Sequence, residues 1–202
     1  KYVTAQMDRC NPLVEEAIYA FQDTRLVRQI AEVARVRELV ADADLYAGGI
    51  SMMGRRQFLN PHIDNSHDHE RHRWRVFNLL YYVTPGWQTD WGGNLELWPR
   101  GVSGEPLTID SRFNRLVVMA THQDSWHSVS PVLRDDYRCC VSNYYFSPIP
   151  LRETDQFHVT MFRGRPEQRF RDWLLRADGK LRAGVRAVFR SGVVPVTHIY
   201  RR

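Results

Sequence analysis

Four polar residues stand out because their types and spacing suit metal chemistry. His62 and Asp64 are two residues apart, His127 follows 63 residues after Asp64, and Arg138 lies 11 residues further on. Two histidines and a carboxylate can hold Fe(II) on one face and leave the opposite positions open. Alternate residues of a strand point the same way, which suits His62 and Asp64 as adjacent ligands. A guanidinium can pair bidentately with a carboxylate. The set predicts an iron site with Arg138 as a clamp for an anionic cosubstrate.

The tripeptide His62-Ile63-Asp64 is weak evidence by itself, because His122-Gln123-Asp124 repeats the pattern. The second copy would need His158 as its third ligand and Arg169 as its clamp. Only 34 residues separate Asp124 from His158, which leaves too few strands to close a barrel. The interval between Asp64 and His127 has room for four strands, enough for the chain to return to the same open end of the barrel. The first copy is therefore favoured.

The first forty residues carry apolar side chains at helical spacing. The pattern runs from Leu13 to Phe21 and resumes from Leu26 to Val40, in steps of three and four residues. Asp23-Thr24 between the two runs suits a helix cap. We expect these helices to cover one face of a sheet.

From residue 45 the pattern changes to short runs rich in β-branched and aromatic residues, separated by Gly, Pro, Asn and Asp. The runs are Leu45–Met53, Gln57–Ile63, Val76–Thr84, Asn94–Trp98, Pro106–Ile109, Arg115–Ala120, Trp126–Val129 and Tyr137–Phe146. About eight strands in one domain predict two sheets packed face to face, as in a β-sandwich or jelly roll. Gly92 and Gly93 mark a tight turn or a close approach of two backbone segments.

The chain changes character again after residue 147. Phe157–Phe162 is predicted as an edge strand, and Pro166–Arg176 as a helix with Phe170, Trp173 and Leu174 on one side. Ala183–Val194 has an ambiguous pattern. A length of 202 residues suits one domain. We expect a helical flank (1–44), a jelly-roll core (45–147) and a C-terminal extension (148–202).

Composition limits the partners and the compartment. The net charge is +5, but the basic residues are spread along the chain and no nucleic-acid-binding motif accompanies them, so we expect no nucleic-acid partner. No apolar run approaches the ~20 residues of a membrane span, so no membrane partner is expected either. Three cysteines, two of them adjacent, do not make a disulfide framework. A reducing cytoplasm is the expected location.

An ordered series of motifs extends across residues 45–147. The motifs are Asn78–Val83 followed by Trp87, then Trp91–Trp98, Asn114–Met119, Ser125-Trp126-His127 and Tyr137–Phe146. In this order they resemble the prolyl-4-hydroxylase-type 2-oxoglutarate/Fe(II)-dependent dioxygenases. The resemblance implies a mainly β (α+β) fold: a double-stranded β-helix, which is a cupin-like jelly roll. N-terminal helices would pack on one sheet, and a short helical extension would follow.

The same resemblance implies roles for individual residues. His62, Asp64 and His127 would ligate iron, and Arg138 would bind the distal carboxylate of 2-oxoglutarate. Tyr82 matches the position whose hydroxyl assists this arginine, although its neighbour Tyr81 is an alternative. The cofactors implied are Fe(II), 2-oxoglutarate and O₂, with ascorbate as a possible reductant. One departure is Met52-Met53, which stands where many relatives have a tyrosine.

The activity expected is hydroxylation of an unactivated C–H bond, with succinate and CO₂ as products. The substrate would be a small molecule or a peptide: a prolyl residue, an amino acid or another metabolite. Between the second ligand and the next strand lies a polar, histidine-rich segment that we interpret as a lid rather than a second metal site. Asn65, Arg73 and Trp87 are candidate substrate contacts.

Two alternatives remain open. One is a non-catalytic jelly-roll module that binds a metal or a ligand; the presence of a complete triad together with Arg138 argues against it. The other is a halogenase or desaturase on the same scaffold. Related halogenases lack the carboxylate ligand, so the presence of Asp64 disfavours halogenation but not desaturation. The oligomeric state is not predicted.

Overall fold

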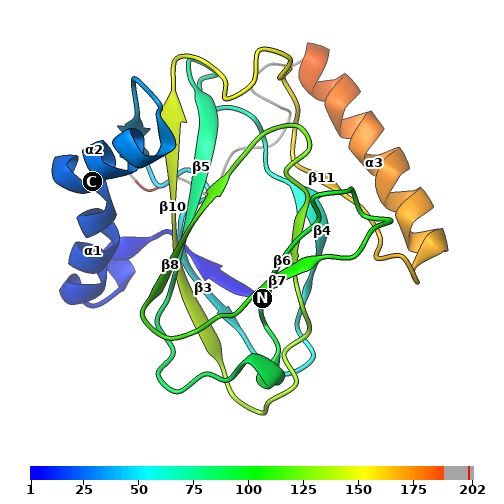
Figure 1. Cartoon of the computed structure of the whole chain (residues 1–202), viewed down its shortest axis with the longest axis horizontal. Helices are drawn as coiled ribbons and strands as arrows, with labels where there is room; N and C mark the ends of the chain where they lie inside the picture. The colour runs from blue at the N-terminus through cyan, green and yellow to red at the C-terminus, as the bar shows by residue number, and fades with distance from the viewer. Residues whose placement is uncertain (189–199, 201–202) are drawn as a thin grey trace.

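Two antiparallel β-sheets lie face to face in the computed structural model, which describes residues 1–188 and 200 (Figure 1). The first sheet has the order β1-β3-β10-β5-β8, and β2 pairs with the end of β10. Its strands are β1 (Tyr2–Thr4), β2 (Val40–Ala41), β3 (Gly49–Met53), β5 (Trp74–Tyr82), β8 (Arg115–Ala120) and β10 (Arg138–Ser147). The second sheet has the order β11-β4-β9-β6-β7. Its strands are β4 (Leu59–Ile63), β6 (Leu95–Leu97), β7 (Leu107–Ile109), β9 (His127–Val129) and β11 (Met161–Phe162).

The eight predicted core strands are confirmed as β3 to β10. Strand β8 has the predicted bounds, while β5 begins at Trp74 rather than at Val76. The chain passes repeatedly from one sheet to the other, so the strands form the predicted double-stranded β-helix. Four strands, β5 to β8, lie between Asp64 and His127, as the spacing predicted. At Gly92 the predicted close approach occurs: φ is 72°, and an added Cβ would lie 1.9 Å from the carbonyl oxygen of Pro131.

Two helices cover the outer face of the first sheet (Figure 1). They are α1 (Pro12–Tyr19) and α2 (Thr24–Ala34), and short 3₁₀ turns occur at Met7–Arg9, Ala20–Gln22 and Thr89–Trp91. Val27 and Ile30 of α2 pack against a buried cluster of the sheet that includes Val76 and Tyr145. Asp23 caps α2 as predicted, because its side chain accepts a hydrogen bond from the backbone N–H of Arg25.

The predicted helical pattern through Val40 is wrong beyond Ala34. Arg35 adopts a left-handed conformation with φ of 56° and ends α2, and Val40 begins β2. The apolar stripe is also not wholly internal, since Leu13 and Val33 are 71% and 87% exposed. Strand β1 was not predicted, because three residues that pair with β3 leave too short a pattern.

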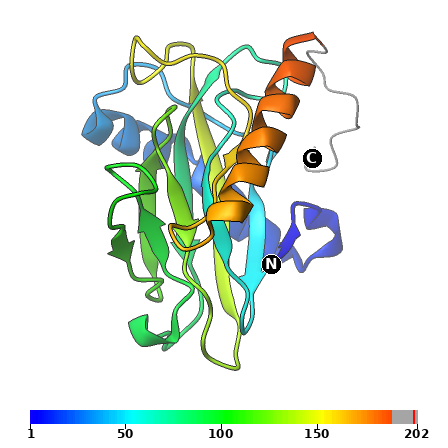
Figure 2. The same cartoon turned by 90° about the vertical axis from the view of Figure 1, so that its right-hand side faces the viewer.

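The C-terminal extension packs on the second sheet. Strand β11 pairs with β4, which confirms the predicted edge strand only at its last two residues, Met161 and Phe162. The helix α3 (Arg169–Val188) follows (Figure 2). The helix begins three residues after Pro166 and continues well past Arg176, so the predicted bounds are wrong at both ends. It also includes Ala183 to Val188 of the ambiguous stretch; residues 189–194 lie outside the described residues.

A buried ion pair joins this extension to the second sheet. Arg165 donates to Oε2 of Glu96 at 2.7 Å, and the Ser128 hydroxyl donates to the same oxygen at 2.6 Å. Trp98 in turn donates to the Ser128 hydroxyl at 2.8 Å. Glu96 therefore has the structural hydrogen-bonding role that its position on a strand indicates. In the part of the chain that the structure describes, no helix has the length and apolar character required to cross a bilayer.

Removing Glu96 should destabilise the fold, because it leaves the Arg165 charge buried without its partner. We expect Glu96→Ala to lower the free energy of unfolding by about 3 kcal/mol in urea denaturation. Asp124→Ala is the control: it breaks the exposed Arg152–Asp124 pair, and its effect should be below about 1 kcal/mol. Equal effects of the two substitutions would contradict a stabilising role for the buried pair.

Candidate metal centre

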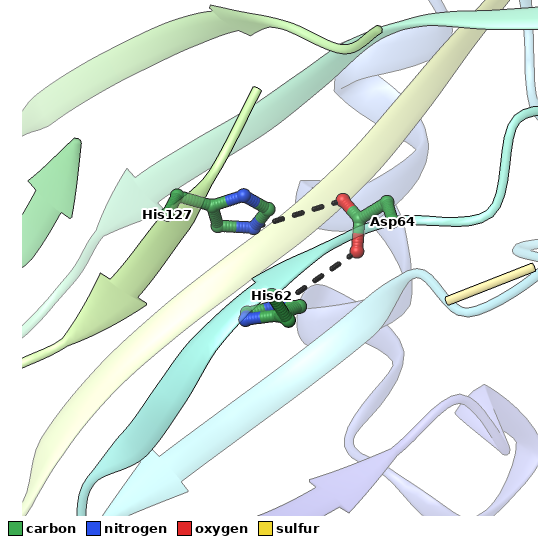
Figure 3. A group of neighbouring side chains, drawn as sticks. All are labelled: His62, Asp64 and His127. Atoms are coloured by element: carbon green, nitrogen blue, oxygen red, sulfur yellow. Dashed lines mark ion pairs between the residues drawn. The ribbon is translucent and has the colours of Figure 1, made fainter. Parts of the chain in front are cut away.

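The pairing of β4 with β9 brings the two predicted histidine ligands together. His62 and His127 are direct partners in the strand register, and their ring centroids are 4.1 Å apart. Asp64 follows β4 by one residue and lies on the same side of the strand as His62. Figure 3 shows the three side chains converging from β4, the residue after it, and β9.

The geometry of the three side chains suits one metal ion. The Nε2 atoms of His62 and His127 each lie 3.8 Å from a carboxylate oxygen of Asp64, one from each oxygen (Figure 3). One ligand atom from each residue can be chosen so that all lie within 4.8 Å of one another, and all three residues are buried. Within residues 1–188 and 200, no other group of His, Cys, Asp and Glu has such an arrangement.

Hydrogen bonds to the backbone orient both imidazole rings. Nδ1 of His62 lies 3.0 Å from the carbonyl oxygen of Asn60, and Nδ1 of His127 lies 3.0 Å from that of Ser125. A carbonyl only accepts, so each Nδ1 carries the proton and donates it. The lone pair of each Nε2 then faces Asp64. Metal-binding histidines are commonly fixed in this way by their second nitrogen.

Burial and charge keep His62 and Asp64 in the protonation states that bind a metal. Burial lowers the pKa of His62 to about 3, and His127 adds to the shift, so the His62 ring is neutral near pH 7. Burial alone would raise the pKa of Asp64, but His127, His62 and Arg75 outweigh it, and the pKa lies below its ordinary value. The carboxylate is therefore ionised. A neutral His62 imidazole and an ionised Asp64 carboxylate suit a site for Fe(II).

Two residues that the sequence analysis missed hold the Asp64 carboxylate. The Asn78 side-chain amide donates to Oδ2 of Asp64 at 3.1 Å, and the Tyr144 hydroxyl lies 3.4 Å from the same amide nitrogen. The Arg75 guanidinium stacks on the Tyr144 ring at 3.9 Å. The period of two was the available signal: Asn78 shares a strand face with Tyr82, and Tyr144 shares one with Arg138.

Arg138 lies at the start of β10 and lines the same pocket as the triad. It is only 3% exposed, its Nε has no hydrogen-bond partner, and one terminal nitrogen donates to the sulfur of Met53 at 3.0 Å. Among the residues described, no carboxylate forms an ion pair with it. A buried charge without an ionic partner is costly, so this pocket is suited to an anionic ligand.

Tyr82 also lines the pocket, and the Arg138 guanidinium lies 5.4 Å from the centroid of its ring. It is almost fully buried, and burial raises the pKa of its hydroxyl, which stays protonated and can donate a hydrogen bond. Tyr81 instead bonds to Asn114 with its hydroxyl and is not among the pocket residues. The position of Tyr82 suits its expected role beside Arg138.

The three candidate substrate contacts do not line this pocket. Asn65 donates to the carbonyl oxygen of His67 and borders a second, smaller cavity that Asp64 also lines. Arg73 is exposed in the loop before β5. Trp87 is buried beside Met53 and donates to the carbonyl oxygen of Gly92, which is an anchoring contact. Their roles in substrate binding stay predictions.

The competing His122–Asp124 copy has a structural role. Nδ1 of His122 accepts from the backbone N–H of Asp124, and the Asp124 carboxylate pairs with Arg152 at 2.9 Å. These groups stabilise a turn and a surface contact. The preference for His62 and Asp64, which depended on the number of intervening strands, is consistent with this arrangement.

Comparison with known proteins agrees with the site. Residues 48–146, from β3 to β10, match the family model of the 2OG-Fe(II) oxygenase superfamily. The matched stretch is just under half of the chain. The match, together with the His62-Asp64-His127 group, supports Fe(II) and 2-oxoglutarate as cofactors, with O₂ as the oxidant. No curated protein sequence is significantly similar to the chain.

Solved structures share the fold at low sequence identity. An oxidoreductase of the 2OG-Fe(II) oxygenase family from Burkholderia pseudomallei matches with a TM-score of 0.51 and 17% identity, over 65% of this chain and 57% of that one. A prolyl 4-hydroxylase structure from Phytophthora capsici matches with a TM-score of 0.51 and 18% identity, over 88% and 58%. The matched parts are thus less than two thirds of those chains. At these identities the similarity establishes the double-stranded β-helix.

The triad should bind a divalent metal, and the competing His122–Asp124 copy should not contribute to the binding. We expect the protein to bind Fe(II), or Co(II) as a spectroscopic probe, at one site in anaerobic titrations. His127→Ala should weaken this binding by at least about 100-fold, because it removes a ligand whose supporting contacts alone are worth 10- to 100-fold. His122→Ala is the matched control and should bind as wild type does. Equal losses in the two variants would contradict the assignment.

Proposed function

We propose that this protein is an Fe(II)- and 2-oxoglutarate-dependent hydroxylase. His62, Asp64 and His127 would hold the iron, and Arg138 would bind the distal carboxylate of 2-oxoglutarate. The observation that supports this most directly is the Arg138 guanidinium, buried without an acidic partner among the described residues and lining the same pocket as the triad. A dicarboxylate that chelates the metal at one end supplies the missing negative charge at the other.

The residues around the cosubstrate have distinct tasks. The planar guanidinium of Arg138 matches a carboxylate with two parallel hydrogen bonds. The protonated hydroxyl of Tyr82 can donate to the same carboxylate. Asn78 and the buried His rings hold their orientation before any ligand enters, which lowers the cost of assembling the site. The leucine and valine side chains that also line the pocket limit the access of water.

When bound, iron and 2-oxoglutarate supply the oxidising power for an unactivated C–H bond, with O₂ consumed and succinate and CO₂ released. The carboxylate of Asp64 occupies the position that a halide would need, so hydroxylation is favoured over halogenation. Desaturation would use the same residues. The non-catalytic alternative does not explain why both histidines are held with Nδ1 protonated and Nε2 available to a metal. It also does not explain a buried arginine that lacks an acidic partner in the described structure.

For the substrate we propose a group of candidate compounds rather than a single one. One structural relative is named a prolyl 4-hydroxylase, which supports a prolyl residue of a peptide as one candidate. Free amino acids and other small molecules are the others, because the fold does not choose among them. Mass spectrometry of peptide and metabolite mixtures, searching for products that gain one oxygen atom, would identify the substrate. We also propose that the chain is a single domain. A cytoplasmic location is proposed as well, and the free state of the three cysteines supports it.

Succinate formation tests the proposed activity. With Fe(II), ascorbate, air and 2-oxoglutarate, we expect slow succinate production even without a substrate, and none above background in His127→Ala. His122→Ala should retain the wild-type rate. An anaerobic binding titration of 2-oxoglutarate accompanies the assay. It is needed because an enzyme that converts 2-oxoglutarate only when its substrate is bound would produce no succinate in this assay. A wild-type protein that neither binds 2-oxoglutarate nor converts it would overturn the proposal.

Arg138→Lys tests the clamp separately. A lysine keeps the positive charge but loses the planar pair of donors, so the affinity for 2-oxoglutarate should fall by about tenfold or more, a loss of about 1.5 kcal/mol or more. Metal affinity without 2-oxoglutarate should stay near that of wild type. Arg152→Lys, at an exposed ion pair, is the control for a general effect of the exchange. Unchanged 2-oxoglutarate affinity in Arg138→Lys would refute the role.

A further inference from the structure

The outward side of α3 is apolar along its whole length. Five large apolar side chains are exposed there: Phe170 (75%), Trp173 (64%), Leu174 (46%), Leu181 (69%) and Val188 (75%). The small residues Ala177 and Gly184 between them are exposed too. We term these seven residues the α3 stripe; each lies one, three or four residues after the one before it. At 100° per residue they fall on one face of the helix.

The opposite side of α3 is fixed to the fold. Asp172 pairs with Arg163 at 2.6 Å and accepts a hydrogen bond from the backbone N–H of Gly164. Gly179 is buried, and a Cβ placed on it would be 3.7 Å from Met161 of β11. The helix cannot turn its apolar face inward without losing these contacts. The exposure of the α3 stripe is therefore a property of the folded protein.

Basic residues flank the α3 stripe on both sides. Arg169, Arg176 and Lys180 lie along one edge and are exposed; Arg171 and Arg182 lie along the other. In total α3 has six basic and two acidic residues, a net charge of +4, while the whole chain carries +5. Both acidic residues are in ion pairs, Asp172 with Arg163 and Asp178 with Arg182. Five of the six basic residues of α3 thus lie beside this apolar surface, and only Arg186 lies on the opposite side of the helix.

This combination matches a particular kind of surface. A helix with Trp, Phe and Leu on one face and Lys and Arg beside them lies in the plane of a membrane interface, with cations at the lipid phosphates. Tryptophan favours that boundary because its ring is amphipathic. Phe170 and Trp173 form a stacked pair with centroids 6.3 Å apart, which makes a continuous aromatic surface near the start of α3.

We propose that α3 docks this protein onto the surface of a membrane that contains anionic phospholipids. The α3 stripe inserts among the headgroups, and the flanking arginines and lysine bind their phosphates. This mode needs no membrane-spanning segment, so it is compatible with the absence of one from the described residues. Because α3 lies on the outer side of the second sheet, the helices α1 and α2 point away from the lipid (Figures 1 and 2).

A second copy of the chain is a poorer occupant for this surface. Symmetric packing of two α3 stripes would set the basic edges of both helices side by side, and like charges that face each other repel. An anionic bilayer attracts the same edges. The described end of the chain does not cover the α3 stripe either, since Tyr200 bonds to the Asp44 carbonyl oxygen and packs with the cluster under α1.

Vesicle flotation of the full chain tests the proposal. We expect binding to vesicles of phosphatidylcholine with phosphatidylserine, little binding to phosphatidylcholine alone, and weaker binding at high salt. The double variant Phe170→Ser/Trp173→Ser should lose about tenfold or more in partitioning. Arg176→Glu/Lys180→Glu should lose at least as much, since each cation near an anionic surface contributes about a fivefold effect.

Matched controls separate α3 from the rest of the surface. Leu133→Ser changes an apolar side chain that is also 64% exposed, and Arg100→Glu/Arg112→Glu reverses two exposed charges elsewhere; both should bind as wild type does. The metal pocket contains no α3 residue, so metal binding by every variant should be unchanged. Absence of wild-type binding to anionic vesicles would overturn the proposal. So would equal binding by the α3 variants, or a solution dimer that Phe170→Ser/Trp173→Ser converts to monomers.

Discussion

The register between β4 and β9 is the constraint on which the rest of the site depends. It sets His62 directly opposite His127, and the alternation along β4 carries Asp64 to the same side. A shift of one residue would turn either histidine to the outer face of the sheet. The buried Glu96, Ser128 and Arg165 lie on or beside the neighbouring strands, and they fix β6, β9 and the C-terminal extension against each other. The ion pair thus supports β9, the strand that carries His127, although none of its groups belongs to the triad.

The interior between the two sheets contains both the apolar side chains that stabilise the fold and the polar side chains of the candidate site. A jelly roll of this size gains most of its stability from apolar burial, yet the space beside Met53 and Leu95 also encloses a triad, Asn78 and Arg138. Burying the Arg138 charge costs free energy that no described carboxylate offsets. A dicarboxylate ligand would offset it, so cosubstrate binding should stabilise the fold as well as prepare the chemistry. The free energy that it costs to bury the Arg138 charge thus contributes to the affinity for an anionic ligand.

Much of this arrangement could be predicted from the sequence. The four residues His62, Asp64, His127 and Arg138 were brought together by a strand period of two and by the number of strands between them, which are properties of the pattern alone. The end of α2 was not predictable in this way, because it depends on the left-handed backbone of Arg35. Asn78 and Tyr144 were missed for another reason: a pattern shows that a residue faces inward but not which atom it will bond.

The helix α3 shows a further limit of prediction from the sequence. Its sequence pattern separates an apolar face from a polar one but does not say which face the fold will use. Gly179 and Asp172 decide this, since one permits close approach to β11 and the other accepts hydrogen bonds from the segment before the helix. Both lie on the side of α3 that faces away from the α3 stripe, so the larger apolar surface is directed outward. The helix also packs through the partly buried Leu175, yet it leaves most of its large apolar side chains exposed. The needs of this core do not explain that exposed face, and a surface outside the molecule explains it better.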